Sequence, residues 1–161
     1  MACPRCQSDD ERFGSDVPHL SLEIWSCNAC GASFTKPVGA PLILNVDDRP
    51  PSLYARSRML RASGFTVTAA TTGEGARAAA LKMRPDLILL DVHLPDADGR
   101  TLCREMRRDA ATRHIPVVLI SATLADHEVA DPAACGAVFF LREPVDADTL
   151  AATVRRALAA A

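Results

Sequence analysis

Three carboxylates in this sequence follow two strand-like runs, and side chains so placed could take part in phosphoryl transfer. The unbroken apolar run Leu87–Leu90 ends at Asp91. The run Leu42–Val46 ends at an acidic pair, Asp47 and Asp48. Such runs are typical of strands buried in a parallel sheet, and ligands of open α/β sheets bind at the carboxyl ends of the strands. We therefore expect the three carboxylates to meet at one edge of a sheet.

The same carboxylates predict a magnesium site. Crowded carboxylates repel one another unless a cation lies among them, and oxygen ligands suit Mg²⁺ better than Zn²⁺. A magnesium ion there would neutralise and orient a phosphoryl group, so that Asp91 could accept it. Taken singly, each acidic residue is more simply an ordinary loop residue at a strand end. Three of them at two such ends favour the metal site.

Four cysteines near the amino terminus have the spacing of a zinc site. They form two C-x2-C pairs, made of Cys3, Cys6, Cys27 and Cys30. Four thiolates arranged in this way bind Zn²⁺ tetrahedrally and can staple a domain that is too short to fold by its core alone. Residues 20–25 and 32–35 alternate like antiparallel strands, so the segment resembles a zinc ribbon. A redox dithiol, a disulfide and chance spacing are the alternatives.

Charge favours a protein-binding or purely structural ribbon over one that binds nucleic acid. Residues 1–40 carry three basic side chains against five acidic ones. Four thiolates around one Zn²⁺ would add two further negative charges, and such a surface repels phosphates.

Composition limits the remaining classes of protein. The chain has 161 residues and a formal net charge of −2, so it has no chain-wide basic footprint for nucleic acid. No apolar run approaches the ~20 residues of a membrane helix, and the amino terminus does not resemble a signal peptide. We therefore expect a cytoplasmic protein without a membrane segment, whose cysteines are reduced.

Beyond the cysteine-rich segment, strand and helix patterns alternate. The expected strands cover residues 42–46, 65–69, 87–90, 115–120 and 138–141. Five βα units predict an α/β domain with a doubly wound, five-stranded parallel sheet. We expect a zinc-ribbon-like domain over residues 1–36, a linker over 37–41 and the α/β domain over 42–161.

From Leu42 onward the chain resembles the receiver domain of response regulators, the CheY-like module of two-component signalling. The matching residues are Asp47 and Asp48, Asp91 to Pro95 with Gly99, Val117 to Ala122, and Gly136 and Ala137 leading to Phe140 and Pro144. They lie in the family's order and spacing over about three quarters of the chain. The resemblance implies the flavodoxin-like strand order 2-1-3-4-5, which places the strand before Asp47 beside the strand that ends at Asp91.

The resemblance also implies roles for individual residues. Asp91 corresponds to the phosphoacceptor. Asp48 corresponds to the direct magnesium ligand, Asp47 to the carboxylate that usually reaches the ion through water, and His93 to a ligand through its backbone carbonyl. Two further positions correspond to the switch residues of the family, and these are the Ser121 hydroxyl and the Phe140 ring. Taken alone, Ser121 could be an incidental hydroxyl and Phe140 a plain core residue.

One site position departs from the family, because Glu143 precedes Pro144 where the family has a lysine. Reversing one charge at about 4 Å changes a pair energy by several kcal/mol at an effective dielectric near 20. We therefore expect Glu143 to weaken phosphorylation or its readout. Arg142 cannot simply substitute, since adjacent strand residues point to opposite faces. A backbone slip that turns Arg142 inward, or a Glu143 side chain that points to solvent, would relieve the problem.

A second departure lies in the stretch 126–134, which corresponds to the fourth helix of the family. Pro132 falls inside it, and a proline in a helix interior costs about 3 kcal/mol relative to alanine. We expect this helix to be short, broken or restarted at Pro132. Cys103 and Cys135 lie far from the cysteine pairs in sequence, and we expect them to be small buried apolar residues.

These observations predict a single-domain response regulator, not an enzyme. It would accept a phosphoryl group on Asp91 from a histidine kinase or phosphotransfer protein, with Mg²⁺, and would then act on a downstream protein by contact. The alternative is a phosphorylation-independent interaction protein in which Glu143 fixes one state and the ribbon binds protein. A nucleic-acid regulator that acts through the ribbon is a weaker third possibility.

Overall fold

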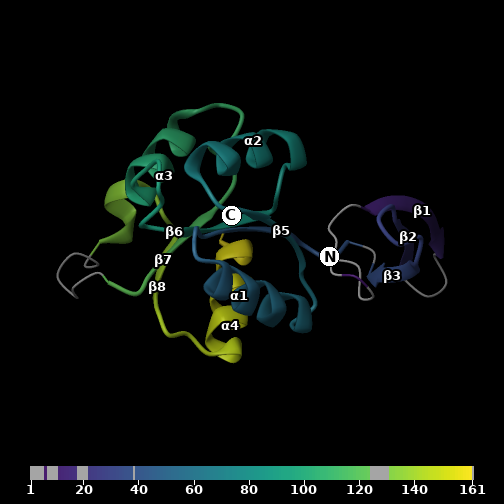
Figure 1. Ribbon diagram of the computed structural model, residues 1–161. Helices are drawn as coiled ribbons and strands as arrows, with labels where there is room; N and C mark the ends of the chain where they lie inside the picture. Colours follow the sequence, from purple (N-terminus) through teal and green to yellow (C-terminus); the bar gives the residue numbers. More distant parts are fainter. Residues whose placement is uncertain (1–5, 7–10, 18–21, 38, 124–130, 161) are drawn as a thin grey trace.

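The chain forms two β-sheet units (Figure 1). The computed structural model describes residues 6, 11–17, 22–37, 39–123 and 131–160. The smaller sheet is antiparallel in the order β1-β2-β3, with β1 at Glu11–Val17, β2 at Leu22–Cys27 and β3 at Ser33–Pro37. The sequence predicts β2 and β3, whereas β1 was not expected.

The larger sheet is parallel and has the order β5-β4-β6-β7-β8. Its strands are β4 (Leu42–Val46), β5 (Thr66–Ala70), β6 (Leu87–Asp91), β7 (Val117–Ser121) and β8 (Phe139–Arg142). Numbered within this sheet, that order is 2-1-3-4-5, so the predicted topology is confirmed. It places β4 directly beside β6, and the carboxyl ends of both strands lie at the same edge of the sheet.

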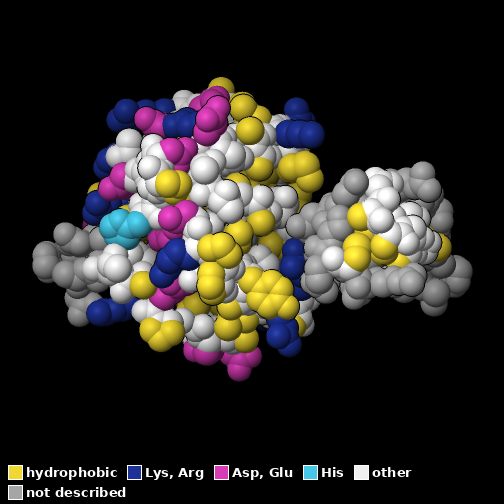
Figure 2. All heavy atoms as spheres, viewed as in Figure 1, with side chains coloured by type: hydrophobic (Ala, Val, Ile, Leu, Met, Phe, Trp, Pro, Cys, Tyr) yellow, Lys and Arg dark blue, Asp and Glu magenta, His cyan; other side chains and the backbone are white. Residues whose placement is uncertain are grey.

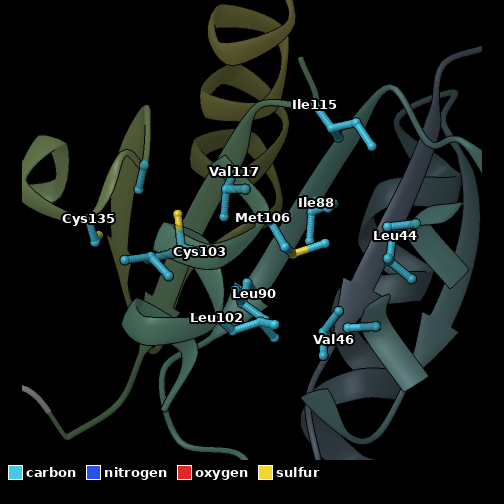
Figure 3. Packing of buried hydrophobic residues seen from close by; sticks show 14 of the residues in the cluster. Leu44, Val46, Ile88, Leu90, Leu102, Cys103, Met106, Ile115, Val117 and Cys135 are labelled. Atoms are coloured by element: carbon cyan, nitrogen blue, oxygen red, sulfur yellow. The ribbon is translucent and has the colours of Figure 1, made fainter. Parts of the chain in front are cut away.

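Helices cover both faces of the larger sheet (Figure 1). These helices are α1 (Pro50–Ala62), α2 (Gly73–Met83), α3 (Gly99–Arg108) and α4 (Ala147–Ala159). Helices α2 and α3 pack on one face, where Leu102 and Met106 meet Ile88 and Leu90 (Figure 3). Helices α1 and α4 pack on the other face, where the core includes Leu60. Because β6 and β7 are buried along their whole length, they form the rigid centre of the domain.

A short helix begins at Pro132, which agrees with the expectation of a short, broken or restarted helix there. Residues Pro132–Cys135 form a short 3-10 helix, η3, whose first turn is capped by Asp131 through a 3.0 Å hydrogen bond from the Ala133 N–H. The part of the expected helix at 126–130 lies outside the described residues. Proline is tolerated at this first position because it has no N–H to leave unsatisfied.

Cys103 on α3 and Cys135 on η3 are both buried, as the sequence predicts. Burial, with the neighbouring Cys135 as a second cause, raises the pKa of the Cys103 thiol to about 12. A thiol with so high a pKa stays protonated at neutral pH and is a poor nucleophile, which fits a packing role.

The surface of the larger unit has no single sign of charge on the face that Figure 2 shows, where acidic and basic side chains are interspersed. Among the described residues, every helix is too short or too polar to cross a lipid bilayer.

Aspartate caps predict a loss of stability in acid. Asp98 accepts a hydrogen bond from the Arg100 N–H at 2.8 Å, and Asp146 accepts one from the Thr149 N–H at 2.8 Å. The Arg100 guanidinium lowers the pKa of Asp98 below its ordinary value of 3.8, and the Thr149 N–H lowers that of Asp146. A carboxyl whose pKa is lowered by folding stabilises the protein above its unfolded pKa, and this contribution is lost as pH falls through the folded value.

The free energy of unfolding should therefore fall as pH drops below about 4. Urea unfolding followed by circular dichroism at about pH 7 and about pH 3 measures the change. In Asp98→Asn/Asp146→Asn the difference between the two pH values should shrink, and the exposed Asp148→Asn is the matched control. An unchanged difference in the double variant would contradict this assignment.

Candidate functional site

Three carboxylates meet at the carboxyl edge of the larger sheet, as the sequence predicts. Asp47, Asp48 and Asp91 each offer an oxygen within 4.8 Å of those of the other two. Asp47 and Asp91 are buried, whereas Asp48 is exposed. Asp48 and Asp91 border a cleft of about 350 Å³, and its other lining residues are Arg49, His93, Ala122 and Thr123. A donor set made of oxygens alone fits Mg²⁺.

Asp91 is held at the end of β6 by the loop that follows it. Its Oδ1 accepts a hydrogen bond from the His93 N–H at 3.3 Å, and the Val92 N–H donates to the Ile120 carbonyl at 3.0 Å. Desolvation by burial raises the pKa of Asp91, and the His93 N–H acts in the opposite direction. A carboxylate that is poorly solvated but still ionised is a good nucleophile, because it loses little hydration when it reacts.

The close approach of Gly99 to Asp91 fixes this loop. A Cβ atom at position 99 would lie 2.2 Å from the Asp91 carbonyl oxygen and 2.9 Å from the Val92 Cα. Both atoms belong to the backbone of the buried strand end, so neither can move aside cheaply. Gly99 therefore allows the first turn of α3 to pack against the candidate phosphoacceptor.

We expect Gly99→Ala to lower the free energy of unfolding by roughly 3 kcal/mol, because the added methyl group forces the backbone of the loop to shift. The measurement is urea unfolding by circular dichroism. Thr101→Ala, an exposed change in the same turn, should lie within about 0.5 kcal/mol of the wild type. Equal midpoints for the two variants would show that the loop tolerates the methyl group.

Arg56 on α1 is a buried cation that the sequence analysis missed. Its guanidinium donates to Asp47 Oδ2 at 2.5 Å and to Glu143 Oε1 at 2.5 Å. Its Nε donates to the Asn45 side-chain oxygen at 3.3 Å, and the Asn45 amide in turn donates to the Ser57 hydroxyl at 3.0 Å. Only 2% of Arg56 is exposed, so these partners replace the water that a guanidinium needs.

Glu143 lies inside the site, and neither arrangement expected from the sequence is correct. Its Oε1 accepts from Arg56 at 2.5 Å and its Oε2 accepts from Arg49 at 2.7 Å, with 14% of the side chain exposed. Arg142 stays exposed, so no backbone slip has turned it inward. Burying Glu143 is possible because two guanidinium groups neutralise it.

Arg49 spans the carboxylates of the site. Besides its bond to Glu143, its Nη2 lies 3.7 Å from Asp91 Oδ2 and 3.5 Å from Asp47 Oδ2. The hydrogen bond to Glu143 is the largest cause that raises the pKa of this guanidinium. The adjacent backbone is fixed as well, because the Arg49 N–H donates to Asp47 Oδ1 at 2.7 Å.

The net charge of the site equals that of the family's pattern despite the departure at position 143. Four carboxylates and two guanidinium groups leave two net negative charges, and the charged residues are Asp47, Asp48, Asp91, Glu143, Arg49 and Arg56. Three carboxylates with one lysine, the pattern of the family, leave the same net charge. The site therefore still suits one divalent cation.

The two expected switch residues lie on neighbouring strands. Ser121 ends β7 and is buried, and its hydroxyl accepts from the Thr123 N–H at 3.2 Å. Phe140 on β8 is half-buried and packs against the core cluster under α2 and α3. Nothing in their contacts tests whether they move together, so their roles stay predictions.

Three of the four predicted zinc ligands come together in the small unit. Cys6, Cys27 and Cys30 each offer a sulfur within 4.8 Å of the other two, while Cys3 lies outside the described residues. The Cys6 and Cys27 sulfurs are 3.6 Å apart, too far for a disulfide of ~2.05 Å. Tetrahedral Zn²⁺ with Zn–S bonds of ~2.3 Å separates its sulfurs by about 3.8 Å, so the thiols fit this ion. The turn that aims them is closed by the Gly31 N–H, which donates to the Cys27 carbonyl at 2.8 Å.

Known proteins resemble the larger unit. PleD, a response regulator of Caulobacter vibrioides, is 42% identical over 113 residues, which are 70% of this chain and 25% of PleD. PilH of Pseudomonas aeruginosa is 33% identical over 117 residues, which cover 73% of this chain and 97% of PilH. The chain thus spans about a quarter of PleD, and it spans about half of RpaA, a transcriptional regulator of Synechocystis that is 36% identical over 118 residues.

Solved structures and a family model agree with these relatives. A putative response regulator from Chloroflexus aurantiacus superposes with a TM-score of 0.71 at 30% identity, covering 74% of this chain and 98% of that one. The receiver domain of the Pseudomonas aeruginosa histidine kinase PA1611, which has a magnesium ion coordinated in its active site cleft, gives a TM-score of 0.68 at 28% identity over 75% of this chain and 99% of that one. The model of the response regulator receiver domain matches residues 43–155. The chain belongs to the response regulator receiver domain family.

Proposed function

We propose that this receiver accepts a phosphoryl group on Asp91 from a histidine kinase or phosphotransfer protein and signals by contact with a downstream protein. The observation that carries the proposal is the meeting of Asp47, Asp48 and Asp91 at the carboxyl edge of the sheet, where the buried Asp91 is one of the residues that line the cleft. The comparisons support it, because PleD is a response regulator and the putative response regulator from Chloroflexus aurantiacus has the same fold. The role is regulatory and not that of an enzyme.

The proposed transfer takes place at the Asp91 carboxylate. An ionised Asp91 oxygen attacks the phosphorus, the P–N bond to the donor histidine breaks, and its electron pair stays on the imidazole nitrogen. The product is an acyl phosphate on Asp91, and the cations of the site hold its oxygens in place. Asp47, Asp48, Asp91 and the His93 carbonyl would hold Mg²⁺, which when bound would offset the charge between carboxylates and phosphoryl oxygens.

Readout would pass through β7 and β8. We propose that the Ser121 hydroxyl turns from Thr123 toward the phosphoryl oxygens and that the Phe140 ring moves with it. The edge of the sheet beside η3 would then change shape, so that a partner protein binds one state better than the other.

The small unit is proposed to be a zinc ribbon that serves as a structural or protein-binding module. Its support is the convergence of Cys6, Cys27 and Cys30, whose sulfurs lie within 4.8 Å of one another, with 3.6 Å between the sulfurs of Cys6 and Cys27. A protein-binding role fits the excess of acidic over basic side chains in residues 1–40.

One observation favours a second candidate, a phosphorylation-independent receiver. Arg49 and Arg56 already place two positive charges among the carboxylates, so the site is partly neutralised without a metal or phosphate. In that case the protein would hold one signalling state permanently.

Incubation with acetyl phosphate and Mg²⁺, followed by intact-mass measurement, separates the two candidates. The receiver proposal predicts a single phosphoryl adduct that is absent in Asp91→Asn and labile to hydroxylamine, as acyl phosphates are. Beryllofluoride should protect the same protein against urea by binding the folded state alone. A folded wild type with neither adduct nor protection would establish the second candidate.

A further inference from the structure

We propose that Arg49 is the phosphoryl-binding cation of this receiver and that Glu143 and Arg56 hold it in position. This inference rests on the proposed function, phosphorylation of Asp91. It assigns to the loop after β4 the task that the family gives to a lysine at the end of β8. Glu143 is then a supporting residue of the site and not a defect in it.

Arg56 is held in place by its partners and cannot itself be the cation that binds the phosphoryl group. Both of its terminal nitrogens and its Nε are engaged, with Asp47, Glu143 and Asn45. The side chain is 3% exposed, and moving it would take their buried cationic partner away from Asp47 and Glu143. Arg56 therefore acts as a positioning residue, which holds Glu143 and Asp47 in place.

Glu143 uses its two oxygens for two different arginines. With Oε1 bound to the immobile Arg56, its Oε2 is left to accept from Arg49 at 2.7 Å. The Glu143 carboxylate thus links the fixed Arg56 guanidinium to the more exposed Arg49 guanidinium. Without the hydrogen bond to Glu143, the long Arg49 side chain, which is 44% exposed, would sample many rotamers in solvent.

Arg49 is the cation that faces the acceptor. Its Nη2 lies 3.7 Å from Asp91 Oδ2, and the residue lines the cleft together with Asp91. A guanidinium carries five N–H donors in a planar fork, so it can bind phosphoryl oxygens while it keeps one bond to Glu143. The separation of 3.7 Å is longer than a hydrogen bond, and a phosphoryl group bonded to Asp91 would extend outward from this carboxylate into the cleft.

The first test compares phosphorylation with magnesium binding in Arg49→Ala. The rate of phosphorylation by acetyl phosphate should fall about 10- to 100-fold, since one charged donor to the transferring group is lost. Calorimetry should show Mg²⁺ binding that is equal or tighter, because the change removes a positive charge beside the carboxylates. Arg49→Lys should recover part of the rate. Arg58→Ala, an exposed arginine on the same helix as Arg56, is the control and should match the wild type.

The second test moves the phosphoryl-binding cation to the position that the family uses. Glu143→Lys alone should slow phosphorylation, because the new ammonium faces the buried Arg56 guanidinium. Glu143→Lys combined with Arg56→Met should restore it, since the introduced lysine can then pair with Asp47. Adding Arg49→Ala to this double variant should cost less than about 3-fold, because the introduced lysine then binds the phosphoryl group in place of Arg49.

The outcomes are distinguishable. A wild-type rate in Arg49→Ala, or weaker Mg²⁺ binding at an unchanged rate, would overturn the assignment of Arg49 and leave the receiver function intact. Faster phosphorylation of Glu143→Lys alone would likewise overturn the assignment of Arg49 and leave the receiver function intact. A wild type that takes no phosphoryl group would overturn both proposals.

Discussion

Replacing Arg56 with methionine should lower the free energy of unfolding by about 3–5 kcal/mol, the cost of breaking a buried ion pair by removing one partner. Methionine has a similar length, so it leaves little empty space. What is lost is the charge that Asp47 and Glu143 share through hydrogen bonds of 2.5 Å each. Both carboxylates would remain in a site where water reaches them poorly.

Urea unfolding of Arg56→Met, followed by circular dichroism at 222 nm, gives the loss from the shift in midpoint at a constant slope. Arg58→Ala on the exposed side of α1 should lie within about 0.5 kcal/mol of the wild type. Arg56→Met/Glu143→Gln should recover part of the loss, because it removes one of the two carboxylate charges that Arg56 had neutralised. If Arg56→Met were as stable as the wild type, water would have to solvate the carboxylates of Asp47 and Glu143 in this variant.

Removal of zinc should unfold the small sheet while the larger sheet keeps its structure. The expected metal content is one Zn²⁺ per chain, and binding to a cysteine site of this kind contributes on the order of 10 kcal/mol. The single tryptophan, Trp25, belongs to β2, so its emission is the probe for unfolding of the small sheet. A chelator should shift that emission to the red and leave the helical signal at 222 nm nearly unchanged.

Cys27→Ser should abolish zinc binding, whereas Cys135→Ala should keep the full zinc content, because Cys135 lies on η3 in the other unit. Metal analysis of the purified variants measures both. A wild type free of zinc, with Trp25 emission insensitive to the chelator, would contradict the zinc site.

The acidic triad could be predicted because simple rules converge on it. The apolar runs before Asp47 and Asp91 identify buried strands, and the topology of parallel βα units places β4 beside β6. A local rule also predicted that the helix would be short, broken or restarted at Pro132, where a new helical turn begins. It did not predict that residues 132–135 would form a 3-10 helix, because proline tolerates both kinds of first turn.

The arginine network could not be predicted in the same way. Arg56 and Glu143 are separated by 87 positions, and their contact depends on how α1 packs on the sheet. A weaker signal was present, since Leu53 and Leu60 lie three or four residues from Arg56 and therefore share its face of the helix. A cation on that inward face needs a buried carboxylate. Glu143 was the candidate for this carboxylate, because the sequence alone indicated no cation to neutralise it.

The dependence of position 143 on position 56 has an evolutionary consequence. If lysine appeared first at position 143, its ammonium group would lie beside the Arg56 guanidinium and be repelled by it. If Arg56 were lost first, Glu143 would lose its buried cationic partner. Each single step lowers stability, whereas the combined change exchanges the buried ion pair of Arg56 and Glu143 for a lysine that can pair with Asp47. Descendants of this receiver are therefore expected to change the two positions together or not at all, so that a survey of natural variants should find them statistically coupled.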